Sequence, residues 1–218
     1  MFSYVFLLGR PGSGKSAVYR LMADRMLKLS LAEEAMRLDD FPVLKQIVDE
    51  DVECRRHVRK EGGFEVTDLS MLDDVLKRMD RQLVELRRPG RVIFVEFSRD
   101  SYSHALRNFS REVLERSFLL YIYCPFELCL QRNERRFKGG AEDLDDHIVP
   151  RDMMERYYRR DDFEELFLAS EEELRRAAPA PLAVIRNDVD DMRALEREVD
   201  GAIASLLAAS KKLGPPKF

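Results

Sequence analysis

The feature that most constrains this chain is an eight-residue run near its amino end, GRPGSGKS at residues 9–16. The run matches G-x-x-x-x-G-K-[ST], a loop whose glycines let consecutive backbone N–H groups point inward at anionic oxygens. An apolar stretch, Tyr4–Leu8, precedes the run, and apolar residues at helical spacing follow it over residues 17–29. This order of strand, loop and helix predicts a phosphate-binding loop on an α/β sheet.

The residues of the loop have separate roles in this interpretation. Lys15 would reach the β- and γ-phosphates of a nucleoside triphosphate, and the Ser16 hydroxyl would be a ligand of Mg²⁺. The helix that follows would add the positive end of its dipole. We expect nucleotide contacts from Gly9, Pro11, Gly12, Ser13, Gly14, Lys15, Ser16 and Ala17.

Size and composition favour one folded domain. The chain has 218 residues, 45% hydrophobic and 36% charged, which suits a single α/β domain with a full core. A formal net charge of −4 disfavours a protein that coats nucleic acid. Three sparse cysteines, no secretory leader and no apolar run long enough to span a bilayer favour a soluble, cytoplasmic protein, which we expect to be a monomer or a homodimer.

Near-continuous apolar runs predict strands that are buried on both faces of a sheet. Clear runs lie at Tyr4–Leu8, 92–95, 118–123 and 182–185, whereas residues 36–38 fit either a short strand or the end of a helix. Helical patterns lie between them, at residues 71–87, 101–115, 126–137, 151–178 and 192–207. This alternation predicts a three-layer αβα sandwich around a doubly wound, mostly parallel five-stranded sheet.

We expect one domain over residues 1–209, followed by a flexible tail at residues 210–218. A helical substrate cap is expected near residues 41–68 and a mobile lid near residues 137–150. The cap contains a dense basic cluster, which would either bind a phosphate already present on an acceptor or decorate a surface helix. The cluster consists of Arg55, Arg56, Arg59 and Lys60.

Missing motifs narrow the class of phosphate-loop protein. The chain has no Asn-Lys-x-Asp motif for reading guanine, since the run after the last predicted strand, residues 187–190, lacks the lysine. It has no transporter-type signature and is short for a mechanical ATPase module. Small phosphotransferases remain.

The order of the other features resembles a P-loop kinase of the nucleoside and nucleotide kinase-like group. Besides the loop, the resemblance is carried by Asp39-Asp40-Phe41, by the strand end at residues 95–100, and by the strand–Pro–helix–Arg pattern at residues 124–136. It covers roughly residues 4–207, and only the loop motif is specific. The resemblance implies transfer of the γ-phosphate of ATP, with Mg²⁺, to a small acceptor, most plausibly a nucleoside or nucleotide.

The same resemblance implies roles for the acidic residues and for one arginine. Asp39 would orient or deprotonate the acceptor, unless the Asp39–Asp40 pair only caps a helix or turn. Glu96 ends a strand at the ligand-binding edge of the sheet, where it would act as base or hold Mg²⁺, unless it forms a structural ion pair. Asp40 and Arg99 would contact the acceptor.

Three arginines, Arg132, Arg135 and Arg136, occupy the end of the helix that enters the predicted lid. Their spacing places at least two on one helix face, and guanidinium groups suit phosphate oxygens. We expect catalytic roles for Arg132 and Arg136. The alternative is a solvated basic helix end, where cations are favoured in any case.

Two other functions stay open at this point. The acceptor can be another hydroxyl compound or a polynucleotide 5′-hydroxyl, although the acidic chain lacks the basic, aromatic stripe of a single-strand binder. The chain can also be a nucleotide-sensing binding module without productive transfer.

Overall fold

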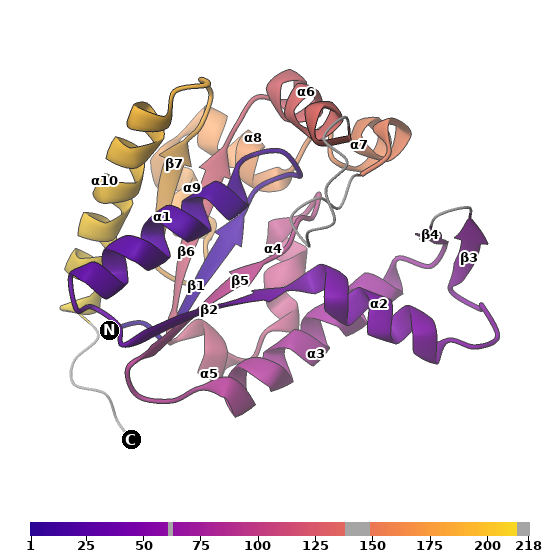
Figure 1. The fold of residues 1–218 in the computed structure, drawn as a ribbon, viewed down its shortest axis with the longest axis horizontal. Coiled ribbons are helices and arrows are strands. Elements are labelled where there is room, and N and C mark those ends of the chain that lie inside the picture. Colours follow the sequence, from indigo (N-terminus) through magenta and orange to yellow (C-terminus); the bar gives the residue numbers. More distant parts are fainter. Residues whose placement is uncertain (61–62, 138–148, 213–218) are drawn as a thin grey trace.

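The computed structural model describes residues 1–60, 63–137 and 149–212, without the side chains of Lys60, Arg136 and Phe137, and centres on a five-stranded sheet (Figure 1). The strands are β1 (Tyr4–Leu8), β2 (Glu34–Asp39), β5 (Arg91–Glu96), β6 (Ser117–Tyr123) and β7 (Leu182–Arg186). Their order is β2-β5-β1-β6-β7, and all neighbours are parallel. The expected parallel α/β sheet is confirmed, and residues 36–38 are strand.

The central strand β1 sends its side chains alternately into two cores. Tyr4, Phe6 and Leu8 belong to one core, and Val5 and Leu7 belong to the other. All five residues are fully buried. Because helices cover both faces of the sheet, an apolar residue is stable at every position of this strand, which explains the unbroken apolar run.

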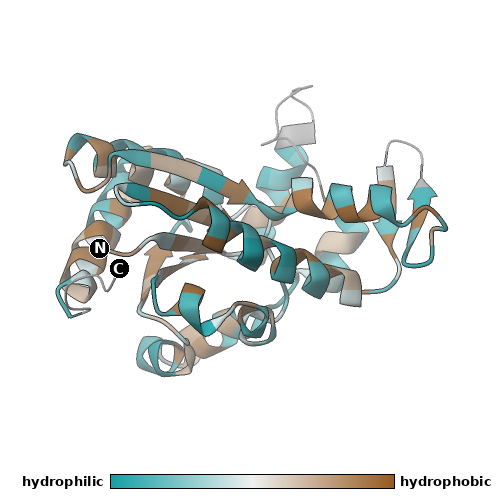
Figure 2. Cartoon of the chain, turned by 90° about the horizontal axis from the view of Figure 1, so that it is seen from below, coloured by the Kyte–Doolittle hydropathy of each residue, from teal (hydrophilic) through white to brown (hydrophobic). Residues whose placement is uncertain are grey.

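Helices form the two outer layers. α1 (Lys15–Lys28) and α10 (Met192–Ser210) pack on the face that contains Val5 and Leu7. α3 (Ser70–Leu86) packs on the opposite face. Figure 2 shows hydrophilic and hydrophobic residues interspersed along these helices, as expected for elements that cover a core with one side.

Two predicted helices are broken into shorter ones. Residues 101–115 form α4 (Tyr102–Ala105), a 3₁₀ turn and α5 (Arg111–Leu114), because Ser101 and Ser110 each cap a new helix. Residues 151–178 form three helices, because Asp161 and Ser170 accept backbone N–H groups as N-caps inside the predicted segment. These three helices are α7 (Arg151–Tyr157), α8 (Asp162–Ala169) and α9 (Glu171–Ala177).

The expected helical cap is part helix and part hairpin. After α2 (Asp40–Glu50), strands β3 (His57–Lys60) and β4 (Gly63–Val66) pair antiparallel, and α2 and this hairpin project from the sheet (Figure 1). Asp51 organises the turn, since it accepts the N–H groups of Arg55 and Arg56 and lies 3.0 Å from the buried ring of His57. The sequence reading missed the hairpin because the charged residues obscured its alternation.

The helix α6 (Phe126–Phe137) follows β6 across the carboxyl edge of the sheet. A small core of Cys124, Cys129, Leu130 and Met154 joins α6 to α7. The predicted lid falls mostly on residues 138–148, outside the described residues. Among the helices that the structure describes, none has the length and apolar composition needed to cross a membrane.

Candidate functional site

The loop between β1 and α1 lies at the carboxyl edge of the sheet, where α/β folds collect their ligands. Gly9, Gly12 and Gly14 have φ angles of 145°, 83° and 100°, in the region that side chains disfavour. Space is restricted as well. A Cβ on Gly12 would lie 2.3 Å from the backbone oxygen of Cys129, and one on Gly14 would lie 2.3 Å from Asn187 Nδ2. The glycines are therefore required by both conformation and packing.

Side chains from distant elements hold the loop backbone. The N–H of Gly9 donates to the hydroxyl of Tyr102 at 2.7 Å, and Asn187 Nδ2 donates to the backbone oxygen of Ser13 at 2.8 Å. Tyr102 and Asn187 are both buried. The loop is thus fixed from α4 on one side and from the segment after β7 on the other.

The contacts that hold the loop backbone form a supporting frame, and Arg10 adds a buried ion pair to it. Its guanidinium group donates to both carboxylate oxygens of Glu164 and to the backbone oxygen of Cys124, and it lies 3.4 Å from Asp161. The Arg10 side chain is only 3% exposed. Burial alone would lower its pKa, but the bond to Glu164 and the charge of Asp161 together raise the pKa above its usual value. Arg10 therefore stays charged and ties the loop to the start of α8.

The start of α8 supports the loop by a second route. Asp162 accepts the N–H groups of Tyr102 and Ser103 and the hydroxyl of Ser101, which orients the first turn of α4. This is the turn that carries the Tyr102 hydroxyl to Gly9. Two adjacent acidic residues, Asp161 and Asp162, thus serve two different parts of the same frame.

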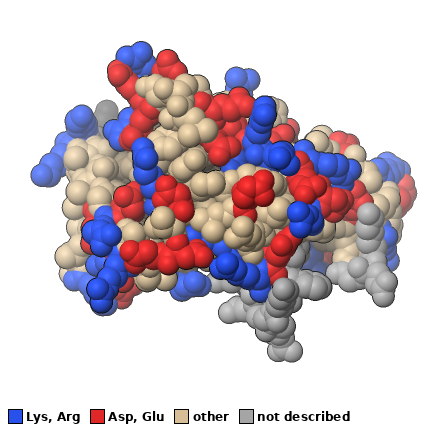
Figure 3. Space-filling model, turned by 90° about the horizontal axis from the view of Figure 1, so that it is seen from above, with Lys and Arg blue, Asp and Glu red and all other residues tan. Residues whose placement is uncertain are grey.

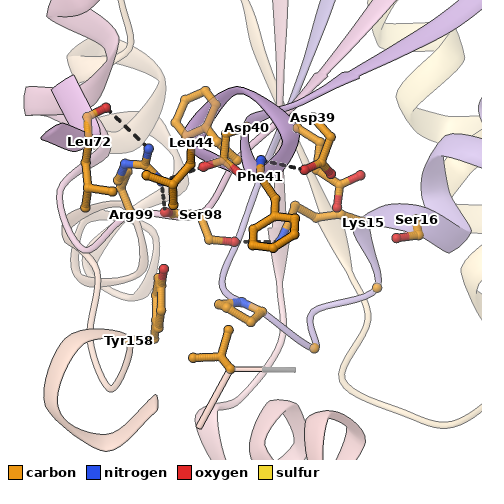
Figure 4. Close-up of a pocket in the computed structure, with 16 residues that line it drawn as sticks. Lys15, Ser16, Asp39, Asp40, Phe41, Leu44, Leu72, Ser98, Arg99 and Tyr158 are labelled. Atoms are coloured by element: carbon orange, nitrogen blue, oxygen red, sulfur yellow. Dashed lines mark hydrogen bonds and ion pairs between the residues drawn. The ribbon is translucent and has the colours of Figure 1, made fainter. Parts of the chain in front are cut away.

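A cavity of about 160 Å³ opens beside the loop (Figure 4). In that view Lys15 and Ser16 lie on one side and Arg99, Leu72 and Tyr158 on the other. We call these sides the loop end and the acceptor end. The cavity is lined by Pro11, Gly12, Gly14, Lys15, Ser16, Asp39, Asp40, Phe41, Leu44, Leu72, Glu96, Phe97, Ser98, Arg99, Val149 and Tyr158.

Neighbouring strands deliver the charged groups of this cavity. Asp39 and Glu96 are register partners at the ends of β2 and β5. Lys15 Nζ donates to Ser98 Oγ at 2.7 Å and to the backbone oxygens of Gly9 and Arg10. The structure therefore gathers Lys15, Ser16, Asp39, Asp40, Glu96 and Arg99 around one space.

Asp39 is both a helix cap and a perturbed acid. Its Oδ1 accepts the N–H of Phe41 at 2.9 Å and so starts α2. Burial and the nearby charges of Asp40 and Glu96 raise the pKa of Asp39 to about 6. The capping interpretation of this residue is correct, and the cap places a carboxyl group of nearly neutral pKa in the cavity.

The two other acids are paired with arginines. Asp40 Oδ2 accepts from Arg99 NH1 at 2.7 Å, and Glu96 lies 3.5 Å from the guanidinium group of Arg37. Arg99 is buried, and its guanidinium also donates to the backbone oxygen of Ser98. Burial alone would lower the pKa of Arg99, but the charge of Asp40, its hydrogen bond and the nearby Tyr158 and Tyr157 together raise the pKa above its usual value.

Arg132, one of the arginines predicted to act with the lid, lies apart from the cavity in the structure. Arg132 donates to the backbone oxygens of Asn187 and Val189 and to the carboxylate of Asp190, and it does not line the cavity. The side chain of Arg136 is outside the described residues. The catalytic roles of these two arginines stay predictions.

The basic cluster of the cap also lies elsewhere. Arg55 is paired with Glu53, and Arg56 is paired with Asp74 at 2.6 Å. None of the described residues of the hairpin lines the cavity. The surface interpretation fits the arginines whose contacts are known.

The residues that sequence reasoning missed are mainly supports. Arg10 was visible as a charge in a loop of otherwise small residues, but its partner Glu164 is 154 positions away. Asn187, which holds Ser13, stands out in the sequence only because residues 187–190 partly match the guanine-reading motif. Tyr158 lines the cavity although no local pattern marks it, and Phe41, which also lines the cavity, is marked only as part of the run Asp39-Asp40-Phe41.

Comparison with known proteins gives similarity of fold only. No family model matches the chain, and no curated protein matches its sequence. Kti12 from Chaetomium thermophilum, solved with ADP-AlF3, is similar with a TM-score of 0.57 at 16% identity, over 93% of this chain and 98% of that chain. The Mycobacterium tuberculosis APS kinase CysC, solved with AMPPNP and APS, gives 0.54 at 16% identity, over 94% and 98%. A gluconokinase from Sinorhizobium meliloti 1021 gives 0.57 at 12% identity, over 98% of each chain.

The close approach at Gly12 predicts a large effect of one methyl group. Gly12→Ala adds a Cβ at 2.3 Å from a backbone oxygen and at a positive φ, so we expect a loss of about 2–4 kcal/mol of stability. Gly201→Ala in α10 is the matched control, because a Cβ there meets nothing within 4 Å. The control should gain up to about 1 kcal/mol in urea unfolding. Equal behaviour of the two variants would contradict the packing described.

The ion pair of Arg10 predicts that its removal is costly. Arg10→Met leaves Asp161 and Glu164 without their cation, so denaturant unfolding should show a loss of about 3–5 kcal/mol. Arg111→Met removes an exposed ion pair with Glu115 on α5 and should leave the unfolding midpoint unchanged. A neutral Arg10→Met would mean that the pair contributes nothing to the frame.

The raised pKa of Asp39 predicts a pH-dependent gain from neutralising it. The native state holds this proton up to about pH 6, whereas an unfolded aspartate releases it near its ordinary value of 3.8. Stability of the natural chain therefore falls as pH rises from about 4 through 6, and it stays lower above that. Asp39→Asn keeps a capping oxygen and removes the charge, so it should stabilise the protein by about 2 kcal/mol at pH 8 and by little at pH 4.

The control for this experiment is Asp49→Asn, an exposed aspartate on the same helix. It should show no gain that grows with pH. If Asp39→Asn destabilises the protein more at pH 8 than at pH 4, the assigned environment of Asp39 is wrong.

Proposed function

From the premise that the chain has the fold of P-loop kinases, we propose that it is a Mg²⁺–ATP-dependent phosphotransferase. It moves the γ-phosphate to a hydroxyl or phosphate group of a small acceptor, with a nucleoside or nucleotide as the first candidate. The observation that carries the proposal is the convergence of Lys15, Asp39 and Glu96 on one cavity beside the glycine loop. Transfer needs positioned phosphates, neutralised charge and an aligned acceptor, and the cavity has a group for each.

The loop end is suited to the phosphates of ATP. The three glycines keep the backbone close to the space that the phosphates would fill, and α1 starts directly at Lys15 with its dipole directed at that space. Lys15 now donates to the loop carbonyls and to Ser98, and a phosphate oxygen would compete for the same ammonium group. Nucleotide contacts are proposed for the predicted residues, which are 9 and 11–17. Two of the similar structures contain ADP-AlF3 and AMPPNP, which supports the same assignment.

The donor set fits Mg²⁺. Mg²⁺ keeps several waters and takes phosphate oxygens, so it needs only one or two protein ligands, all oxygen. The Ser16 hydroxyl and the Glu96 carboxylate line the same cavity and supply hard oxygens of this kind. Across the described ranges, no group of three or more His, Cys, Asp and Glu side chains could hold a metal alone, in keeping with an ion that arrives with ATP. When bound, Mg²⁺ neutralises charge on the phosphates.

Asp39 is the proposed base. Its pKa of about 6 is close to neutral, so it is mostly ionised at pH 7 and can still accept a proton as the acceptor hydroxyl attacks. The Phe41 N–H holds one of its oxygens and fixes the carboxyl group. Asp40 and Arg99 would contact the acceptor, and Arg132 and Arg136 would contact the phosphates, as the sequence predicts.

Surface and thiols fit a small-molecule enzyme of the cytoplasm. Lys and Arg are interspersed with Asp and Glu over the face shown in Figure 3, which is unlike a basic track for a polynucleotide. The cysteines Cys54, Cys124 and Cys129 are free thiols, in keeping with a reducing compartment.

The test is nucleotide binding and turnover of Lys15→Met. Removal of a preorganised cationic donor should lower Mg²⁺-dependent ADP release about a hundred- to a thousandfold, with an unchanged circular dichroism spectrum. Lys28→Met, an exposed lysine on the same helix, is the control and should behave like the natural chain.

Three results would sort the alternatives. ADP release that an added nucleoside, nucleotide or other alcohol stimulates supports the kinase. Tight AMPPNP binding without turnover on any acceptor indicates a nucleotide sensor. Absence of calorimetric heat with Mg²⁺–AMPPNP contradicts the proposed function.

A further inference from the structure

The acceptor end of the cavity has a charge balance that restricts what it can bind. Its only described cation is Arg99, and Asp40 neutralises it at 2.7 Å. The side chains of Arg99 and Asp40 are 7% and 21% exposed, so little solvent screens this pair. Two more carboxyl groups, Asp39 and Glu96, line the same cavity toward Lys15 (Figure 4), and Glu96 lies 3.5 Å from the guanidinium group of Arg37. A second negative charge placed here would meet more acids than bases.

The basic residues nearest in sequence do not correct this balance. The arginines Arg55 and Arg56 on the cap are engaged by Glu53 and Asp74, outside the cavity. Lys15 lies at the loop end, where the phosphates of ATP would occupy it. Among the described residues, no cation is therefore left for a phosphate or carboxylate on the acceptor, and such a group would be desolvated without compensation.

The rest of the acceptor end is apolar. Phe41, Leu44, Leu72, Val149 and Tyr158 supply its surface. The Phe41 ring is held parallel to Phe64 of the hairpin, with ring centroids 6.4 Å apart and an interplanar angle of 7°. The hairpin thus supports the wall of the cavity that contains Phe41, which is one structural role of the projecting cap. An apolar or planar face of an acceptor would be buried against this wall.

We infer that the acceptor is an uncharged hydroxyl compound, such as a nucleoside or a polyol, and not a phosphorylated or carboxylated one. Asp40 accepts a hydrogen bond from a ligand hydroxyl and Arg99 donates one, and the Asp40–Arg99 pair has no net charge. This inference rests on the proposed function of the same cavity, and it separates nucleosides from nucleotides, which the sequence left together.

The experiment compares matched pairs on the protein saturated with Mg²⁺–AMPPNP. The pairs are thymidine and thymidine 5′-monophosphate, cytidine and cytidine 5′-monophosphate, glycerol and glycerol 3-phosphate, and sorbitol and gluconate. Binding is measured by saturation-transfer NMR and calorimetry. We expect at least one uncharged member to bind about tenfold or more tightly than its charged partner.

A variant tests the cause of the preference. Asp40→Asn removes the counter-charge of Arg99, so the preference should shift toward the charged member of the same pair by about tenfold. Asp49→Asn on the same helix is exposed and outside the cavity, and it should leave the order unchanged. If Asp40→Asn does not fold, the order in the natural chain decides alone.

The outcomes separate the two proposals. A charged member that binds more tightly in the natural chain overturns the inference. So does the absence of binding by every uncharged member at about 1 mM while AMPPNP binds. Failure of AMPPNP itself to bind overturns the proposed function instead.

Discussion

The structure depends on how little room the glycine loop, residues 9–16, has between its neighbours. Gly9 approaches the backbone oxygen of Ile122, Gly12 approaches that of Cys129, and Gly14 approaches the side chain of Asn187. These contacts fix the end of β6, the first turn of α6 and the segment after β7 relative to one short turn. In a close-packed interior such contacts prevent these segments from moving relative to the loop. The conformation of the loop therefore determines the shape of the cavity beside it.

Charge is distributed differently at the two ends of the site. Behind the loop, one buried guanidinium group, that of Arg10, faces two acids, and burial raises the pKa of Asp161 to about 6 despite that cation. Inside the cavity, Arg99 is matched by a single partner. The first arrangement holds the backbone, whereas the second leaves an ion pair without net charge that lines the cavity. Arginine therefore supports the loop in one place, and under the proposed function it contacts the acceptor in the other.

Local patterns predicted the sheet and the glycine loop because both depend on neighbours in sequence. An apolar run followed by glycines predicts the strand β1 and the turn after it. The capping role of Asp39 was also one of the alternatives, since an aspartate before a helix is a local signal. The prediction of one long helix at residues 151–178 was wrong because Asp161 and Ser170 are N-caps. Nothing in the local sequence distinguishes these two residues from polar residues inside a helix. The partners of Arg10 and Arg132 lie far away in sequence, and only the fold brings them together.

The route from Gly9 through Tyr102 to Asp162 has a consequence for the size of the smallest working unit. A chain shortened to end before α8 would keep the strand, the glycines and the first helix, and would lose both the anchor of Arg10 and the acid that orients α4. The glycine loop therefore does not keep its conformation when it is separated from the rest of the domain. The conformation of the loop depends on contacts with residues as far along the chain as Asn187. Grafting the eight-residue motif onto another sheet would therefore transfer its sequence without the contacts that fix its conformation.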